Sequence, residues 1–386
     1  MDDTFAQPTT PPPYRMAALV ALGTLALYVA TLAPTTQFWD TSEYIAAAYV
    51  LGVPHPPGNP LFTLLAHTWG LIPWVAGYAM RINLFAAVTS AIAASCWFLV
   101  GERWLRPIVP ALWPRRLAAL AGTICSAAAF SVWNQSVVNE KVYTLSLLSI
   151  ALILWLIVRW DDQPAGEAHD HYLLLIMYLL ALTSTNHMMG VLVGPVVVVL
   201  LFPPLKDRVA APVERRMEWS QFAVFSATYA VLVASGLESM KPLAAAGVLF
   251  AIALVVAVYY GSWQFAVASL LVAAVGLSVY VYLPIRAAHL PPINEGEPTT
   301  WNALYEVLTR AQYGKPSIFD DPRVPSGATN PGHTLVLYGQ QILNYVQYFG
   351  WQWGRDFSDG VRAFLAVIFG SLGVLGAMRH WRVDRA

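Results

Sequence analysis

Residues 242–260 read PLAAAGVLFAIALVVAVYY and contain no charged side chain. A helix needs about 20 mostly apolar residues to cross the hydrocarbon core of a bilayer, so this stretch predicts a membrane span. Residues 263–285 repeat the pattern after a break of two residues. The whole chain has the same character, because 57% of its 386 residues are hydrophobic and only 11% are charged. Soluble domains carry about 25% charged residues, so a soluble enzyme, a disordered chain and a coiled coil are excluded.

Working outward from this pair, eight further apolar runs predict about ten spans in all. The runs are residues 16–33, 82–100, 117–133, 142–158, 172–184, 187–202, 219–236, 242–260, 263–285 and 360–378. The first run follows a polar, proline-rich tail without a small-residue cleavage site, so we interpret it as a retained anchor and not as a signal peptide. The sequence therefore predicts an all-α polytopic membrane protein.

Basic residues gather in three places, around residues 103–116, 206–216 and 379–385. The positive-inside rule assigns all three clusters to the cytoplasm. This assignment requires residues 172–202 to cross the membrane twice, with a turn at residues 183–187. The tail at residues 1–15 is then cytoplasmic.

The same topology divides the chain into four parts, the first of which is the tail at residues 1–15. Residues 16–285 form the transmembrane core, residues 286–359 form an outer segment, and residues 360–386 supply the last span and a cytoplasmic tail. Within the core, residues 34–81 form a long first outer loop with helical character. Because long ordered loops usually carry function, we expect the active site on this loop.

The first outer loop places two acids close together. Asp40 and Glu43 are three positions apart at the start of a helix-like stretch, so they lie on the same side of its first turn. Simple capping of a short interfacial helix is the alternative. The loop continues Val53-Pro-His55-Pro-Pro-Gly-Asn59-Pro, a rigid turn that holds His55 with little freedom. His55 could bind a phosphate or a sugar hydroxyl or orient Asp40; an exposed histidine on a structural hinge is the alternative.

Other polar candidates lie at the outer ends of later spans. Glu140 precedes Tyr143 at the mouth of a span, where a solvated Glu–Lys end is the alternative interpretation. Asn186 and His187 fall in the predicted turn at membrane depth, where polar groups are costly and tend to be functional, although a role in breaking the helix is the alternative.

A basic and an aromatic segment complete the predicted outer face. Arg286 ends a span on the outer side, where its planar fork of donors suits a phosphate and where snorkelling to lipid headgroups is the alternative. Tyr313 and the aromatic strip at residues 345–353 suit sugar faces and lipid headgroups alike.

Ionisable residues from five separate segments thus converge on one predicted face. Acids and cations at a membrane surface indicate an active site for a charged, lipid-linked substrate. A pore would instead place such residues along span interiors. The sequence has no glycine-rich phosphate loop, metalloprotease motif or Cys/His metal cluster, and its net charge of zero does not indicate a nucleic-acid partner.

Four blocks carry a resemblance to a known family. They read WDTSEYIAAAYVLGVPHPPGNPLFTLLAH from residue 39, WNQSVVNEKVYTLSLL from 133, YLLALTSTNHMMGVLVGP from 178 and VYLPIRAAHLPPINEGEPTTWNALYEVLTRAQYG from 281. Together they resemble a bacterial family long labelled as a domain of unknown function, which includes the eukaryotic transmembrane protein O-mannosyltransferases that modify plexin-type receptors. The family is similar to the GT-C glycosyltransferases.

This resemblance implies a bacterial inner-membrane enzyme with a GT-C-like fold and its active site on the periplasmic face. It would move a hexose such as mannose from a polyprenyl-phosphate donor to an acceptor hydroxyl, on protein Ser/Thr or on a glycan, with inversion. As a hypothesis, Asp40 is the catalytic base and Glu43 supports it. A divalent cation between Asp40 and Glu43 is compatible with the pattern but is not required, because the lipid carries one phosphate.

The remaining candidates divide between the donor phosphate and the rest of the substrate. We expect Arg286, His187 and His55 at the phosphate, and Glu140, Tyr143, Asn186, Asn59 and Tyr313 at the sugar or acceptor. A lipid-linked-sugar flippase and a non-catalytic membrane scaffold with the same fold are the two alternatives to an enzyme.

Overall fold

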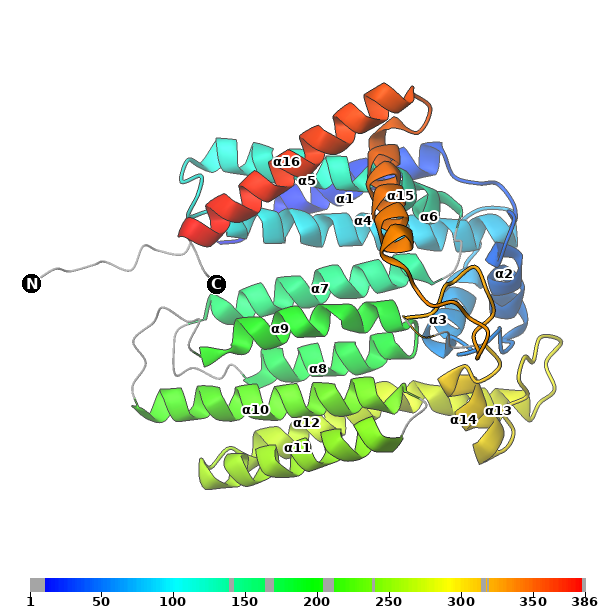
Figure 1. The fold of residues 1–386 in the computed structure, drawn as a ribbon, viewed down its shortest axis with the longest axis vertical. Coiled ribbons are helices and arrows are strands. Elements are labelled where there is room, and N and C mark those ends of the chain that lie inside the picture. The colour runs from blue at the N-terminus through cyan, green and yellow to red at the C-terminus, as the bar shows by residue number, and fades with distance from the viewer. Residues whose placement is uncertain are drawn as a thin grey trace, which may run out of the picture.

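The protein folds into a bundle of roughly parallel and antiparallel helices, seen in a computed structural model (Figure 1). The structure describes residues 11–138, 142–163, 170–203, 212–237, 240–313, 317 and 319–383. Within these ranges every regular element is helical, and the one β-type pairing is an isolated parallel bridge between Val53 and Asn294. The predicted all-α class is therefore confirmed.

All ten predicted apolar runs are helical. The helices are α1 (Tyr14–Ala30), α4 (Tyr78–Trp104), α5 (Leu112–Ala127), α7 (Tyr143–Asp161), α8 (Asp170–Ser184), η1 (Met188–Val193) with α9 (Gly194–Leu201), α10 (Pro212–Ser235), α11 (Met240–Tyr259), α12 (Trp263–Leu277) and α16 (Asp359–Val383). By length and composition, 5 helices of the described residues are able to cross a membrane, or 6 if the bent pair α5–α6 counts as one. A multi-span membrane protein is supported, and the number of ten spans stays a prediction.

Residues 172–202 form two successive helical segments, as the prediction of two crossings requires. α8 ends at Ser184, and His187 begins the short 3₁₀ helix η1, which leads into α9. In Figure 1, α8 runs toward one end of the bundle and α9 runs back. The turn at residues 183–187 therefore lies at the same end of the bundle as the loop between α1 and α4.

Helix α4 lies at the centre of the bundle and packs against α1, α5 and α7. Its inward face is rich in alanine, and Ala86, Ala87 and Ala93 are completely buried. Small side chains allow helix backbones to approach closely, which is how helices associate in a lipid environment that offers no hydrophobic drive. Larger residues, including Phe98 on α4 and Ile153 on α7, fill the remaining core.

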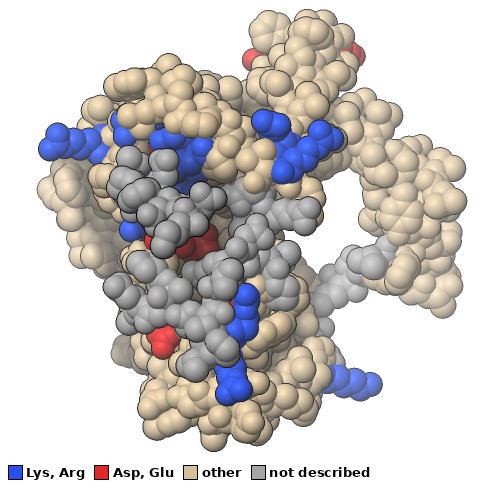
Figure 2. Space-filling view, turned by 90° about the vertical axis from the view of Figure 1, so that its left-hand side faces the viewer, with Lys and Arg blue, Asp and Glu red and all other residues tan. Residues whose placement is uncertain are grey.

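One end of the bundle is basic. Figure 2 shows Lys and Arg side chains gathered on the end from which both chain termini leave. Two ion pairs lie there: a buried one between Arg115 and Glu102 at 2.8 Å and a partly buried one between Arg103 and Asp162 at 2.6 Å. This arrangement agrees with the cytoplasmic assignment of the basic clusters, although Lys206 and Arg208 lie outside the described residues.

The opposite end, which the topology predicts to be the outer one and which we call the outer end, carries the two long segments. The first outer loop contains α2 (Thr41–Val50) and α3 (Pro60–Gly70), and the later segment contains η3 (Ser278–Val281), α13 (Tyr282–Ala287), α14 (Trp301–Thr309) and α15 (Leu335–Gly354). α6 (Phe130–Val138) ends at this face, and α15 runs across the direction of the spans (Figure 1). The helical first loop is as predicted.

Candidate functional site

Asp40 sits at the entrance to helix α2. It is the N-cap residue, and the preceding Trp39 adopts a left-handed backbone with φ of 73°. The Asp40 side chain makes no capping hydrogen bond to the helix. The capping alternative is therefore not observed, and a left-handed tryptophan is an uncommon conformation that the surrounding fold must stabilise.

Glu43, one turn into α2, is bound to His55 at two points. Its Oε1 accepts a hydrogen bond from the His55 backbone N–H at 2.6 Å, and its Oε2 lies 2.9 Å from His55 Nδ1. Both side chains are about one-fifth exposed. The proline-rich turn thus brings His55 to Glu43, its direct partner, and the orientation of Asp40 by His55 stays a hypothesis.

The titration of this pair follows from its contacts. Burial alone would raise the pKa of Glu43, but the hydrogen bonds and charge of His55 outweigh burial and lower that pKa. The hydrogen bond to Glu43 raises the pKa of His55 against the effect of burial, and the charges of Asp40 and Glu295 add to the rise. The contacts therefore favour the ionised form of Glu43 and the protonated form of His55 relative to the free side chains.

A chain of buried polar groups connects this turn to two other segments. The Tyr44 hydroxyl donates to Asn59 Oδ1 at 3.0 Å and lies 3.4 Å from His55 Nε2. Asn59 donates to the backbone carbonyl of Asn186, and Asn186 donates in turn to Ser146 Oγ at 2.9 Å. The structure thus brings the predicted residues Asn59 and Asn186 together, and their amides tie the first outer loop to α7 and α8.

The backbone of the proline-rich turn packs closely against helix α13. Gly58 has φ of +83°, and a Cβ there would lie 2.7 Å from Leu283 Cδ2, so only glycine fits. The backbone of Val53 exchanges hydrogen bonds with Ile293 and Glu295 at 2.8 and 2.9 Å. This bridge places a third carboxylate, Glu295, beside the acid pair, and burial followed by the charges of Glu43 and Asp40 raises the pKa of Glu295.

Arg286 is hydrogen-bonded to the first outer loop. Its Nε and Nη2 donate to the carbonyls of Leu51 and Val50 at 2.6 and 3.0 Å, at the end of helix α2. A cation at that end is favourable because the helix dipole is negative there. Arg286 therefore anchors α2, and its predicted role at the phosphate stays a prediction.

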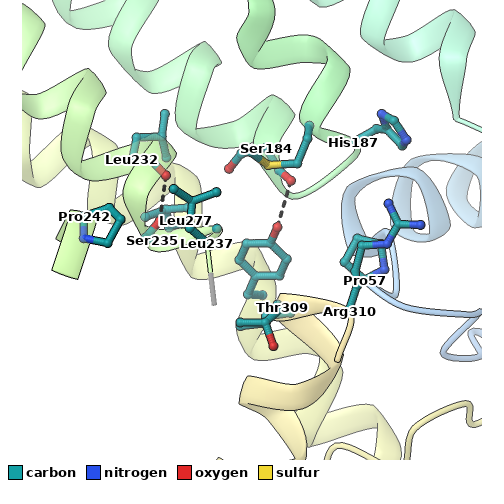
Figure 3. Close-up of a pocket in the computed structure, with 14 residues that line it drawn as sticks. Pro57, Ser184, His187, Leu232, Ser235, Leu237, Pro242, Leu277, Thr309 and Arg310 are labelled. Carbon is teal, nitrogen blue, oxygen red and sulfur yellow. Dashed lines mark hydrogen bonds between the residues drawn. The ribbon is translucent and has the colours of Figure 1, made fainter. Parts of the chain in front are cut away.

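A cavity of about 570 Å³ opens beside these groups. We name it the Arg310 cavity; one end is polar and includes His187, Arg310 and Ser184, while the other is lined by Leu232, Leu237 and Leu277. Figure 3 shows the His187 ring and the Arg310 guanidinium on one side of the cavity near Pro57, away from the leucines. The cavity thus joins a cationic end to an apolar end between α10, α11 and α12.

Two predicted tyrosines lie next to this polar end. The guanidinium of Arg310 lies over the Tyr313 ring at 5.1 Å from its centroid, a cation–π contact that orients the arginine. The Tyr143 ring packs edge-on against His187 with centroids 5.3 Å apart. Glu140, the remaining candidate, lies outside the described residues.

The acid pair does not form a ready metal site. Across the described ranges, no group of three or more His, Cys, Asp or Glu side chains has an arrangement that could hold a metal ion. Both Glu43 oxygens are engaged by His55. A cation shared by Asp40 and Glu43 stays a prediction, and no step of the reaction is assigned to one.

Sequence reasoning missed two residues of the site. Arg310 ends α14 in a left-handed conformation, with φ of 57°, and Glu295 follows the bridge at Val53. Both lie in the fourth family-like block, in the outer segment, so a search for ionisable residues on the outer face would have included them. The placement of Glu295 near the charges of Glu43 and Asp40, and of Arg310 beside Pro57, depends on tertiary structure that spacing does not encode.

The fold and the site define a helical membrane protein with a carboxylate-rich outer face beside an amphipathic cavity. Residues 40–209 match the family model described as the N-terminal domain of the protein O-mannosyl-transferase TMEM260. The chain is 31% identical over 207 residues to the TMEM260 protein O-mannosyl-transferase of Mus musculus and 26% identical over 148 residues to that of Dictyostelium discoideum. These matches confirm the resemblance to the TMEM260 family over residues 40–209.

The similarity covers part of each protein. The alignment with the mouse protein includes 51% of this chain and 28% of the mouse protein, and the alignment with the Dictyostelium protein includes 38% of this chain and 17% of that protein. The chain thus matches less than a third of the length of these relatives. No solved structure matches the chain.

Proposed function

We propose that this protein is a membrane glycosyltransferase that moves a hexose such as mannose from a polyprenyl-phosphate donor to a Ser or Thr hydroxyl of a protein. The observation that carries the proposal is the Arg310 cavity, whose cationic end includes Pro57 of the proline-rich turn that also carries His55, and whose other end is apolar. A prenyl phosphate has the same two-part chemistry. The relatives named as protein O-mannosyl-transferases support the class of reaction.

The donor would bind with its chain among Leu232, Leu237 and Leu277 and its phosphate near Arg310 and His187. When the bond between the anomeric carbon and the phosphate oxygen breaks, negative charge grows on the departing polyprenyl phosphate. A guanidinium placed where this charge develops lowers the barrier. Arg310, steadied by Tyr313, is suited to this role.

Asp40 would act as the general base. The acceptor oxygen attacks the anomeric carbon as the lipid phosphate leaves, and the hydroxyl proton passes to the Asp40 carboxylate. A single displacement of this kind inverts the anomeric centre. Glu43, held ionised by His55, would keep the local field negative and stabilise the sugar-side cationic character of the transition state.

The proposal is tested with purified protein in nanodiscs and a panel of polyprenyl-phosphate hexoses. We expect wild type to release polyprenyl phosphate and to glycosylate a Ser/Thr-containing peptide with the inverted anomer. Retention of the anomeric configuration would overturn the single-displacement mechanism. Donor that crosses the bilayer unchanged would instead identify a flippase, and binding without turnover of any donor would favour a scaffold.

A second arm tests the metal-free mechanism. Transfer should survive dialysis against EDTA, since the described acid pair offers no ligand set for a cation. Activity lost in EDTA and restored by Mn²⁺ or Mg²⁺ would contradict this part of the proposal, while leaving the class of reaction unchanged.

A further inference from the structure

A second cavity, of about 490 Å³, lies at the outer end of the bundle between α4, α6, α7, η1 and α15. We name it the Ser90 cavity. Its described lining contains hydroxyl and amide side chains but no charged one. These polar residues are Ser90, Ser131, Asn134, Gln135, Ser136, Tyr143, Thr144 and Tyr348. The lining therefore suits a neutral ligand rich in hydrogen-bonding groups.

Ser90 itself points to a ligand. The residue is 2% exposed on helix α4, and its Oγ has no hydrogen-bond partner in the described part of the chain. Serine in a helix normally bonds to a carbonyl one turn back, as Ser95 does to Ile92 at 2.7 Å on the same helix. A buried hydroxyl without a partner is costly, so a ligand group in the cavity would satisfy it.

The two cavities lie back to back. Met188 lines the Arg310 cavity and the next residue, Met189, lines the Ser90 cavity. Tyr143 lines the Ser90 cavity while its ring contacts His187, which lines the Arg310 cavity. The Tyr143–His187 contact and the adjacent residues Met188 and Met189 thus lie between the Arg310 cavity and the Ser90 cavity.

Helix α15 closes one side of the Ser90 cavity. The Tyr348 and Ser131 hydroxyls are hydrogen-bonded, and Gln352 Oε1 accepts from the Ser131 backbone N–H at 3.0 Å. Trp353 adds a hydrogen bond from Nε1 to the Cys125 carbonyl at 3.0 Å. The outer segment therefore completes a cavity whose floor belongs to the transmembrane core.

We propose that the Ser90 cavity binds the acceptor as an extended peptide segment that presents its Ser or Thr hydroxyl toward the Tyr143–His187 wall. This inference rests on the proposed function and names the place of its second substrate. Amides such as Asn134 and Gln135 pair with peptide groups, and Val132, Leu147 and Met189 supply aliphatic surface for the neighbouring side chains. A glycan would require several hydroxyls to be satisfied at once and is the competing outcome.

Photocrosslinking tests the location directly. Benzoylphenylalanine is placed at Val132 in the Ser90 cavity or at Leu237 in the Arg310 cavity, in the full chain in nanodiscs. We expect a labelled Ala-Thr-Ala-Ser-Ala peptide to crosslink at position 132 and not at 237, and polyprenyl phosphate to show the reverse. Labelling of position 132 by the lipid or by a mannose oligosaccharide in place of the peptide, or no peptide labelling there, overturns the proposal.

Kinetics supply the matched variants. Ser90→Val and Gln135→Leu each remove one hydrogen-bonding group and should raise the acceptor KM by about three- to tenfold while leaving the donor KM unchanged. Ser95→Val, the same change on the same helix but outside the cavity lining, should leave both values at wild type. If the acceptor KM does not change in the cavity variants, or if the donor KM rises with it, the proposal is wrong.

The experiments distinguish a failure of the proposed function from a failure of the assignment of the Ser90 cavity to the acceptor. Peptide labelling at position 132 without sugar transfer would keep the binding site and end the proposed function. Sugar transfer with peptide labelling elsewhere would keep the function and end the assignment of the Ser90 cavity. Gln135→Leu covers the case in which Ser90→Val does not fold, because Gln135 lies at the partly exposed end of α6.

Discussion

Acidic side chains have different partners at the two ends of the bundle. At the inner end, Glu102 has a side chain only 2% exposed, and it is neutralised by Arg115 and Arg106. At the outer end, Glu43 has a histidine as its partner, and Asp40 and Glu295 lie near enough to shift the pKa of that histidine. The inner acids are saturated by guanidinium groups, whereas the outer acids outnumber the single titratable cation among them.

This difference assigns a role in stability to the acids at the inner end and a role in the reaction to the acids at the outer end. A carboxylate locked between arginines cannot accept a proton from a substrate, but it can hold helix ends together. At the outer end, the Glu43 carboxylate is bonded to a histidine that is about one-fifth exposed, and no guanidinium contacts Glu43 among the described interactions. The comparison predicts that inner-end variants change folding and that outer-end variants change turnover.

Asp40→Asn should give the largest effect. Removing a general base typically costs 10²–10⁴-fold, so transfer should fall by at least about a hundredfold. Donor affinity and thermal stability should stay near wild type, measured by lipid-binding and melting experiments in nanodiscs. Glu306→Gln, at an exposed acid on α14, is the matched control and should remain active. Full activity of Asp40→Asn would remove Asp40 from the reaction.

Glu102→Gln should affect stability instead. Breaking a buried pair strands the Arg115 charge and costs about 3–5 kcal/mol, read as a lower free energy of unfolding in detergent titrations. The kcat of the folded fraction should be unchanged. Replacing Glu102 and Arg115 together by methionine should recover most of the loss, because no buried charge remains unpaired. A catalytic defect in folded Glu102→Gln protein would contradict the division between the two ends.

Arg310→Gln should raise the donor KM by about ten- to a hundredfold, as expected for one lost hydrogen bond to a charged group. Arg286→Gln is the informative comparison, because Arg286 binds the carbonyls at the end of α2. That variant should lower stability more than donor affinity. The reverse ranking in donor binding would return the phosphate role to Arg286.

The smallest effect concerns pH. The raised pKa of His55 stabilises the fold below the ordinary histidine value of about 6.5, and this contribution is lost as the pH rises through the raised pKa. The lowered pKa of Glu43 contributes above the ordinary glutamate value of about 4.3 and is lost as the pH falls through the lowered pKa.

The melting temperature should therefore be highest between these limits, and its fall on the alkaline side should flatten in His55→Gln. His67→Gln is a suitable control, because His67 bonds only to the Ala48 carbonyl in the described contacts. An unchanged alkaline limb in His55→Gln would mean that the Glu43–His55 pair does not titrate as its contacts indicate.

The sequence by itself determined the helical class, the position of every apolar run and the end of the bundle on which the basic clusters lie. Hydrophobicity over about 20 residues and the charge of the connecting loops are local properties, so they can be read without knowing the fold. The same holds for Asp40, Glu43 and His55, because a short loop and a rigid turn keep them together along the chain.

Only the tertiary structure decided which distant residues join them. Glu295 comes near the acid pair through the backbone bridge at Val53. Arg310 lines the cavity that also includes Pro57, and Arg286 is occupied by helix α2. Ser90 faces a cavity while Ser95 does not, although both are serines on one apolar helix. Such assignments depend on the rotation of each helix and on contacts between segments more than 200 residues apart, which no local pattern specifies.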